Sequence, residues 1–188
     1  AWGDSPDAVT DRTGTYVLTY EGEGELKLGL DAHVLSSEPG KIVFENRDVG
    51  TFVLNILETD PNGTGNYIQD IAIVQEQYLD LHEAGALYNP EWLALIEDAR
   101  QIRFMDWQET NNSTTVSWDE RSQPDGLRTD DGIAVEDMVD LANLVGSDPW
   151  FNMPHMADDD YIRAFATYVR DNLDPALEVR VEYSNEWW

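Results

Sequence analysis

The sequence predicts a mixed α/β protein in which a β-rich region is followed by alternating helices and strands. In the first 75 residues, short runs of β-branched, aromatic and alternating residues are separated by turns that contain Gly or Pro. Closely spaced short runs of this kind are typical of an antiparallel sheet or sandwich. After residue 75 the apolar residues recur with a period near 3.6, and helical stretches alternate with short apolar runs. That alternation predicts a parallel sheet with crossover helices, so we expect one domain over residues 1–75 and another over residues 76–188.

Five strands are expected in the β-rich region, over residues 15–20, 25–30, 41–45, 51–57 and 67–74. The run at 25–30 alternates strictly between apolar and other residues, as a half-buried strand does. Pro39 and Gly40 form a turn before the third run, and residues 60–63 end the fourth.

The second region is expected to contain three helices and three short strands. One helix begins at Pro90 with Asn89 as its N-cap, and its apolar stripe starts at Trp92. A second helix covers residues 133–145 and ends before Gly146, a natural C′ residue. A third covers residues 158–173 and opens with three aspartates, which the helix dipole favours at that end. The strands are expected over residues 102–105, 149–153 and 177–183.

Composition excludes several classes of partner. The chain has 188 residues, 38 acidic against 11 basic, and a formal net charge of −27. That charge would repel nucleic acid and disfavours an anionic lipid surface. The sequence holds no run of about 18 apolar residues, so we expect no membrane span. The absence of cysteine excludes a disulfide framework, cysteine-ligated zinc and a thiol nucleophile.

The basic residues are skewed toward arginine, with Lys27 and Lys41 as the two lysines of the chain. An acidic, lysine-poor surface repels itself unless salt screens it, and at about 1 M salt the Debye length falls to about 3 Å. We interpret this as a salt-adapted protein; an ordinary acidic extracellular protein is the alternative. The sequons at Asn62, Asn111 and Asn112 give weak support for export, and we expect an extracellular location, secreted or at the cell surface.

Polar and aromatic side chains follow each of the three strands expected in the second region. The first strand carries Arg103 and is followed by Asp106 and Trp107. The second runs into Asn152, Pro154 and His155, and residues 183–188 follow the third. The carboxyl ends of parallel strands share one edge of a sheet or barrel, and that edge is where such folds place their sites. The sequence therefore predicts one functional edge built from all three strand ends.

The segment at 182–186, Glu-Tyr-Ser-Asn-Glu, resembles the Asn-Glu motif that closes the fourth strand of clan A (β/α)8 glycoside hydrolases, in a cellulase-like bacterial and archaeal subset. Residues 103–107, 110–112 and 150–155 are similar to the earlier barrel strands of that subset, so the resemblance covers about residues 90–188. The β-rich leader is similar to the one that precedes such barrels. The resemblance implies a partial (β/α) barrel-like unit after a small antiparallel sandwich or sheet.

The resemblance also implies roles for single residues. Glu186 would be the general acid that protonates the glycosidic oxygen and then the base that activates water. Asn185 would hydrogen-bond the sugar 2-hydroxyl, and aromatic rings would stack on the C–H faces of sugars. The residues expected to bind substrate are Asn185, Trp107, Trp150, His155, Arg103, Asp106 and Trp187.

The length departs from this family pattern. A complete barrel needs about 250 residues, and a retaining site needs a second carboxylate about 5–5.5 Å from the first. Only 114 residues remain from residue 75 onward. We therefore expect the N-terminal portion of a secreted, salt-adapted retaining glycoside hydrolase that acts on a polysaccharide and is inactive by itself. Its open sheet edge should pair with the missing C-terminal half or with another copy.

Two other classes stay open. The chain is alternatively a non-catalytic carbohydrate-binding or surface-interaction module in which the same tryptophans form a binding face, or a structural surface protein without a ligand. No cofactor and no metal site are expected. The Asp158, Asp159 and Asp160 run lacks the spacing and glycine of a calcium loop, so a structural calcium ion has no motif behind it.

Overall fold

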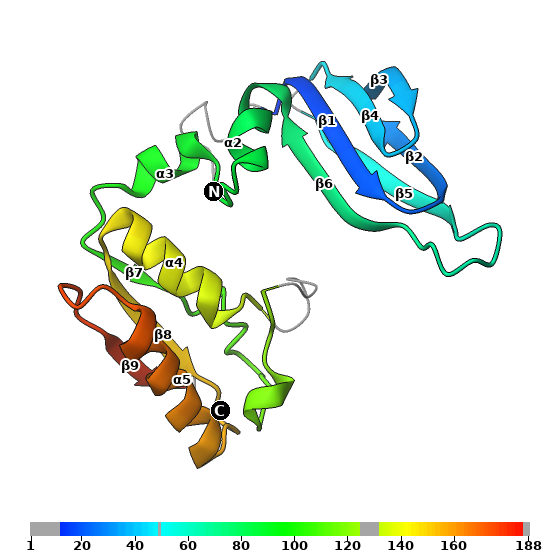
Figure 1. Ribbon diagram of the computed structural model, residues 1–188. Helices are drawn as coiled ribbons and strands as arrows, with labels where there is room; N and C mark the ends of the chain where they lie inside the picture. The colour runs from blue at the N-terminus through cyan, green and yellow to red at the C-terminus, as the bar shows by residue number, and fades with distance from the viewer. Residues whose placement is uncertain (1–11, 49, 125–131, 186–188) are drawn as a thin grey trace. The chain divides into compact units, whose positions relative to one another are not determined.

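The computed structural model describes residues 12–48, 50–124 and 132–185 and divides the chain into two compact units, residues 1–92 and 93–188 (Figure 1). The protein is mixed α/β and contains antiparallel sheets, as expected. The last strand of the first unit ends at Gln75, close to the expected domain boundary. Residues 76–92 stay with that unit, and their first helical turns contact its strands.

In the described part of the first unit, six antiparallel strands form two sheets. Four strands form a sheet in the order β3-β4-β1-β6, and the remaining two pair as β2-β5. Their bounds are β1 Gly14–Glu21, β2 Gly24–Leu30, β3 Ala32–Glu38, β4 Lys41–Asn46, β5 Phe52–Thr59 and β6 Gln69–Gln75. Five of these match the predicted strands. Sequence reasoning missed β3, which lacks an apolar alternation and forms by pairing with β4 across the turn at Gly40 (φ 80°).

The core of the first unit lies between the two sheets. Leu18 and Phe44 are fully buried in the four-stranded sheet, and leucines of β2 and β5 pack against this cluster from the other side. Phe44 meets Phe52 of β5 edge-on at 5.0 Å between ring centres and stacks on Tyr16 at 5.4 Å. Face-to-face packing of this kind makes the unit a small sandwich.

Two short helices and a 3₁₀ turn complete the first unit and lead to the second. They are η1 (Glu76–Tyr78), α2 (Leu79–Glu83) and α3 (Pro90–Ile96). The predicted cap of α3 is confirmed, because the Asn89 side-chain oxygen accepts a hydrogen bond from the Glu91 amide at 2.8 Å. The apolar stripe of α3 does not form core, since none of its residues is buried.

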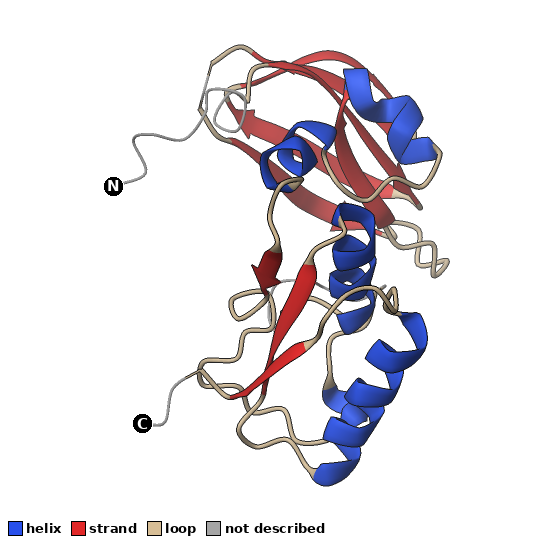
Figure 2. Cartoon of the chain, turned by 90° about the vertical axis from the view of Figure 1, so that its left-hand side faces the viewer, coloured by secondary structure: helices blue, strands red, loops and turns tan. Residues whose placement is uncertain are grey.

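The second unit is built on a three-stranded parallel sheet in the order β7-β8-β9. The connections between neighbouring strands carry α4 and α5, which lie against the same face of the sheet (Figure 2). The bounds are β7 Gln101–Arg103, η2 Trp118–Glu120, α4 Val135–Val145, β8 Asp148–Met153, α5 Asp159–Asn172 and β9 Arg180–Tyr183. The predicted parallel sheet with crossover helices is thus confirmed, each element to within a few residues of its expected ends.

The caps expected in this unit are present. Gly146 ends α4 in the left-handed conformation at φ 73°, and Asp158 caps α5 by accepting the Tyr161 amide at 2.7 Å. Between helices and sheet, Phe151 stacks on Phe104 at 5.6 Å and meets Phe165 of α5 edge-on at 5.1 Å. Among the described residues, no helix combines the length and the apolar character that crossing a membrane requires.

Candidate functional site

The two faces of the parallel sheet have opposite characters. Phe151, Met153 and Val181 lie on the face that α5 covers, where they line one apolar groove with the helix. Because side chains alternate along a strand, Trp150 and Asn152 of β8 and Glu182 of β9 lie on the other face. Arg103 of β7 is in register with Trp150 and joins them there. We call Arg103, Trp150, Asn152, Glu182 and Asn185 the inner-face cluster.

Arg103 is the centre of the inner-face cluster. Its Nη2 atom donates to Glu182 Oε2 at 2.8 Å and to Asn185 Oδ1 at 2.7 Å. The guanidinium carbon lies 5.0 Å from the centre of the Trp150 ring, within the range of a cation–π contact. One side chain from the first strand therefore links residues of the second strand, the third strand and the segment that follows it.

Asn152 is the most deeply placed member, with no exposed surface. Its Nδ2 atom donates to Glu182 Oε2 at 2.9 Å, whereas its buried Oδ1 atom has no hydrogen-bond partner among the described residues. Its main-chain amide donates to Gln108 Oε1 at 2.7 Å. Strand β7 is only three residues long, so the Gln108 side chain occupies the ladder position that a longer β7 would fill. A buried carbonyl oxygen without a partner is costly. Because Asn152 has no exposed surface, a ligand would reach this oxygen only after neighbouring side chains move.

Glu182 is the carboxylate of the inner-face cluster. The hydrogen bond from Arg103 lowers the pKa of Glu182, burial acts in the opposite direction, and donors on Asn152 and Trp150 lower it further. Each of these donors favours the charged form of the carboxyl group. Glu182 is therefore an ionised, paired acceptor at neutral pH and does not serve as a proton donor there.

The position of Asn185 depends on the residue before it. Ser184 is buried and adopts the left-handed conformation at φ 57°, while its amide donates to Met153 O at 2.9 Å. Beyond this turn the Asn185 amide is held at both ends, since its Oδ1 accepts from Arg103 and its Nδ2 donates to Asn111 Oδ1 at 3.0 Å. A strained non-glycine conformation at a polar cluster is a common mark of a functional position.

The structure brings three of the predicted site residues together: Arg103, Trp150 and Asn185. Trp107 lies in the turn after β7, with its ring 5.6 Å from that of buried Phe104, and Asp106 is exposed in the same turn. His155 is exposed in the β8–α5 loop, where its main-chain oxygen accepts from the Tyr183 hydroxyl at 2.7 Å. Glu186 and Trp187 lie outside the described residues.

Sequence reasoning noted Asn152 at the end of the second strand and Glu182 within the Asn-Glu segment, but it gave no site role to Asn152, Glu182, Gln108 or Asn111. The two-residue alternation could have identified the first two. Asn152 is two positions from Trp150 on the same strand, and Glu182 is its partner on the next one. Gln108 and Asn111 lie in the long connection after β7, where no periodicity predicts which way a side chain points.

The described residues contain no group of three or more His, Cys, Asp or Glu arranged to hold a metal ion. Asp158, the first residue of the three-aspartate run, instead has a structural role as the cap of α5. The inner-face cluster therefore offers hydrogen-bond donors and acceptors with one aromatic ring, a set that suits a hydroxyl-bearing ligand. Comparison with family models, curated proteins and solved structures gives no match to this chain.

Proposed function

We propose that this chain is the N-terminal portion of a secreted, salt-adapted retaining glycoside hydrolase that acts on a polysaccharide, with Glu186 as its general acid and base. The observation that carries the proposal is the inner-face cluster at the carboxyl ends of three parallel strands. Enzymes built on parallel (β/α) units place their sites at that end of the strands. Glu186 directly follows Asn185, a member of the cluster.

The composition of the cluster supports a sugar as the ligand. Sugar hydroxyls act as donors and acceptors, and the cluster combines amide, guanidinium and carboxylate groups beside the Trp150 ring. Aromatic rings match the apolar C–H face of a pyranose.

The exposed apolar surface beside β9 supports a barrel that continues beyond three strands. Val179 is 43% exposed and Val181 62% exposed, and both line a groove with the helix α5. Strand β9 pairs with β8 alone among the described strands, although open strand edges invite further pairing. A fourth connection built like the two before it would lay a helix over this groove and a strand along this edge, from the missing half or from a second copy.

The charge distribution supports adaptation to salt in both units. The first unit has 17 acidic and 4 basic residues, a formal charge of −13, and the second has 21 acidic and 7 basic residues, a formal charge of −14. Repulsion of this size within each unit is tolerable only when it is screened.

The test uses the full-length product of the gene that encodes this chain, in molar KCl. Glu186→Gln should lower turnover of an unactivated β-glucan by about 100-fold or more, because it removes the proton donor and retains the shape. Glu178→Gln is the matched control, since Glu178 is exposed and eight residues upstream. An active Glu186→Gln enzyme contradicts the catalytic assignment.

A non-catalytic carbohydrate-binding module is the second candidate. It is favoured by the pairing within the cluster, where Glu182 is paired with Arg103 and both ends of the Asn185 amide are engaged. In that case neither the full-length protein nor its Glu186→Gln variant hydrolyses glycan, and both bind it with the same affinity. Trp150→Ala should then reduce binding at least about tenfold.

A further inference from the structure

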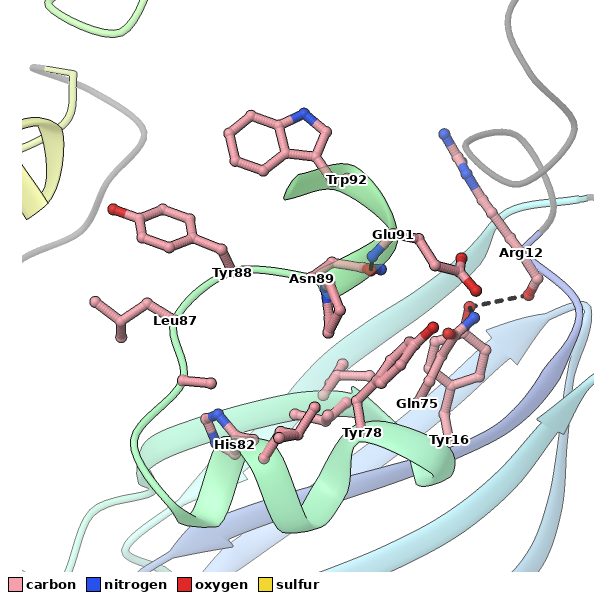
Figure 3. Close-up of a pocket in the computed structure, with 15 residues that line it drawn as sticks. Arg12, Tyr16, Gln75, Tyr78, His82, Leu87, Tyr88, Asn89, Glu91 and Trp92 are labelled. Carbon is pink, nitrogen blue, oxygen red and sulfur yellow. Dashed lines mark hydrogen bonds between the residues drawn. The ribbon is translucent and has the colours of Figure 1, made fainter. Parts of the chain in front are cut away.

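The first unit contains a pocket that is far along the sequence from the inner-face cluster. It has a volume of about 460 Å³, and all of its lining residues belong to the first unit (Figure 3). Its base is the end of strands β1 and β6, one side is η1 with α2, and the other is the loop that leads into α3. A cavity of 300–1,000 Å³ is the usual size of a small-molecule site.

The walls of the pocket are rich in aromatic rings with polar edges. Tyr16, Tyr78, Tyr88 and Trp92 all line it, and the Tyr88 and Trp92 rings lie 6.0 Å apart at 31°. Figure 3 shows Tyr78 and Tyr16 rising from one side toward Glu91 on the other. The Tyr78 hydroxyl is hydrogen-bonded to Glu91, which raises the pKa of Tyr78. This bond joins the 3₁₀ turn η1 to α3 and holds two walls of the pocket together.

The remaining polar groups are mostly neutral or balanced in charge. Gln75 and His82 line the pocket, and Gln75 Nε2 donates to the Tyr16 hydroxyl at 3.2 Å. Arg12 and Glu91 bring one charge of each sign. A phosphorylated or otherwise anionic ligand would meet Glu91 and the net charge of −27, which disfavours it.

Exposed apolar groups lie on both sides of the pocket, Leu81 on α2 and Leu87 on the loop that leads into α3. Leu81 is 46% exposed and Leu87 58% exposed, and Figure 3 shows Leu87 and His82 at one end. Burying these leucines under the apolar face of a ligand is favourable, because it removes apolar surface from water. The amides and hydroxyls in the same pocket need hydrogen-bond partners from that ligand. A pyranose ring meets both requirements, since its C–H faces are apolar and its rim carries hydroxyl groups.

From this combination we propose that the pocket of the first unit is an accessory binding site for a neutral saccharide of one or two sugar rings. The choice of a saccharide as the ligand rests on the proposed function. A hydrolase that acts on a polysaccharide benefits from an accessory site that holds the same polymer. The pocket is lined by neither Trp150 nor any other member of the inner-face cluster, so each site can be tested without the other.

The experiment is titration calorimetry of the 188-residue chain in 2–3 M KCl with cellobiose, xylobiose and mannobiose as probes. At least one should bind, and Trp92→Ala should weaken it about tenfold or more. Leu87→Asp is a second variant at an exposed position, which places a carboxylate at the pocket and should weaken binding to a similar degree. Tyr67→Ala is the matched control, since Tyr67 is 57% exposed in the same unit and does not line the pocket. Circular dichroism identifies any variant that fails to fold.

Each outcome decides the proposal. Binding that survives Trp150→Ala and is lost in Trp92→Ala and Leu87→Asp supports it. Binding that is lost only in Trp150→Ala belongs to the inner-face cluster and overturns it. The proposal is also overturned when a folded chain binds none of the three probes, or binds an amino acid or organic cation in their place. Hydrolysis that depends on Glu186 in the full-length protein is unaffected by these results, so the two proposals fail separately.

Discussion

The two units bury their apolar residues to different extents although they carry nearly the same charge. Among the described residues, the second unit contributes twelve of the buried hydrophobic side chains and the first unit four. In the second unit, α4 and α5 cover one face of a parallel sheet, and the apolar stripe of each helix is buried there. In the first unit a two-stranded ribbon faces a four-stranded sheet, and several large side chains such as Ile56 and Leu57 stay exposed. Layering a helix on a sheet thus yields more core for the same length of chain.

The largest expected effect is a loss of stability on replacing one buried phenylalanine in each unit. Phe151→Ala should lower the free energy of unfolding by about 3–5 kcal/mol, because Phe104 and Phe165 both pack on the lost ring. Phe44→Ala should cost about 3 kcal/mol, the lower end of that range, since its neighbours Tyr16 and Phe52 are only half-buried and can relax into the space. Urea denaturation followed by far-UV circular dichroism measures both, and a larger loss for Phe44→Ala would reverse the comparison.

The next largest expected effect is the dependence of stability on salt, which should differ between the two units. The melting temperature should rise by at least about 5 °C from dilute buffer to molar KCl, because screening relieves the repulsion within each unit. The first unit has the smaller core for the same charge, so its strands should lose protection first when salt is removed. Hydrogen exchange of amides in β1 and β8 at several KCl concentrations checks this, with sucrose as the uncharged control. A melting temperature indifferent to KCl would contradict salt adaptation.

Replacing Gly146, the left-handed residue that ends α4, should have a smaller effect on stability. Gly146→Ala should destabilise the second unit by about 1–2 kcal/mol, because φ is 73° there and a Cβ atom meets nothing within 4 Å, so the cost is conformational alone. Gly146→Asn should cost less, since Asn tolerates this conformation. The melting temperatures of both variants test the ranking, and Ala and Asn of equal cost would contradict a purely conformational cause.

The smallest expected effect concerns Arg103 and Glu182, whose side chains are about one-third exposed. Arg103→Met should cost at most about 1 kcal/mol at neutral pH, because partly exposed ion pairs contribute little. The pKa of Glu182 is lower in the folded than in the unfolded chain, so the pair's contribution is complete above the unfolded pKa. It is lost as pH falls through the folded pKa. The difference between wild type and Arg103→Met in urea midpoint should therefore shrink on acidification; a constant difference from pH 7 to pH 3 would exclude this linkage.

Local patterns determined most of the elements. The alternation at residues 25–30, the aspartates before α5 and the glycine after α4 each act within a few residues, so the sequence predicts β2, the Asp158 cap and the Gly146 end directly. Strand β3 was missed because its residues lack such a pattern and are extended only through their ladder with β4. The division of the chain at residue 92 was not predicted either, because it depends on where η1 and α2 pack.

The sequence by itself determined the acidic, cysteine-free character of this protein, its β-rich and (β/α) halves, and the candidates Arg103, Trp150 and Asn185. Those inferences need composition, periodicity and the rule that parallel strands end at one edge, and for Trp150 and the role of Asn185 they need the resemblance to glycoside hydrolases as well. Only the tertiary structure decided that Asn152 and Glu182 complete the inner-face cluster, that Gln108 fills the ladder beside β7, and that Trp92 lines a pocket rather than a core. Each of these depends on contacts between residues distant in the chain, where direction and burial follow from packing and not from local propensity.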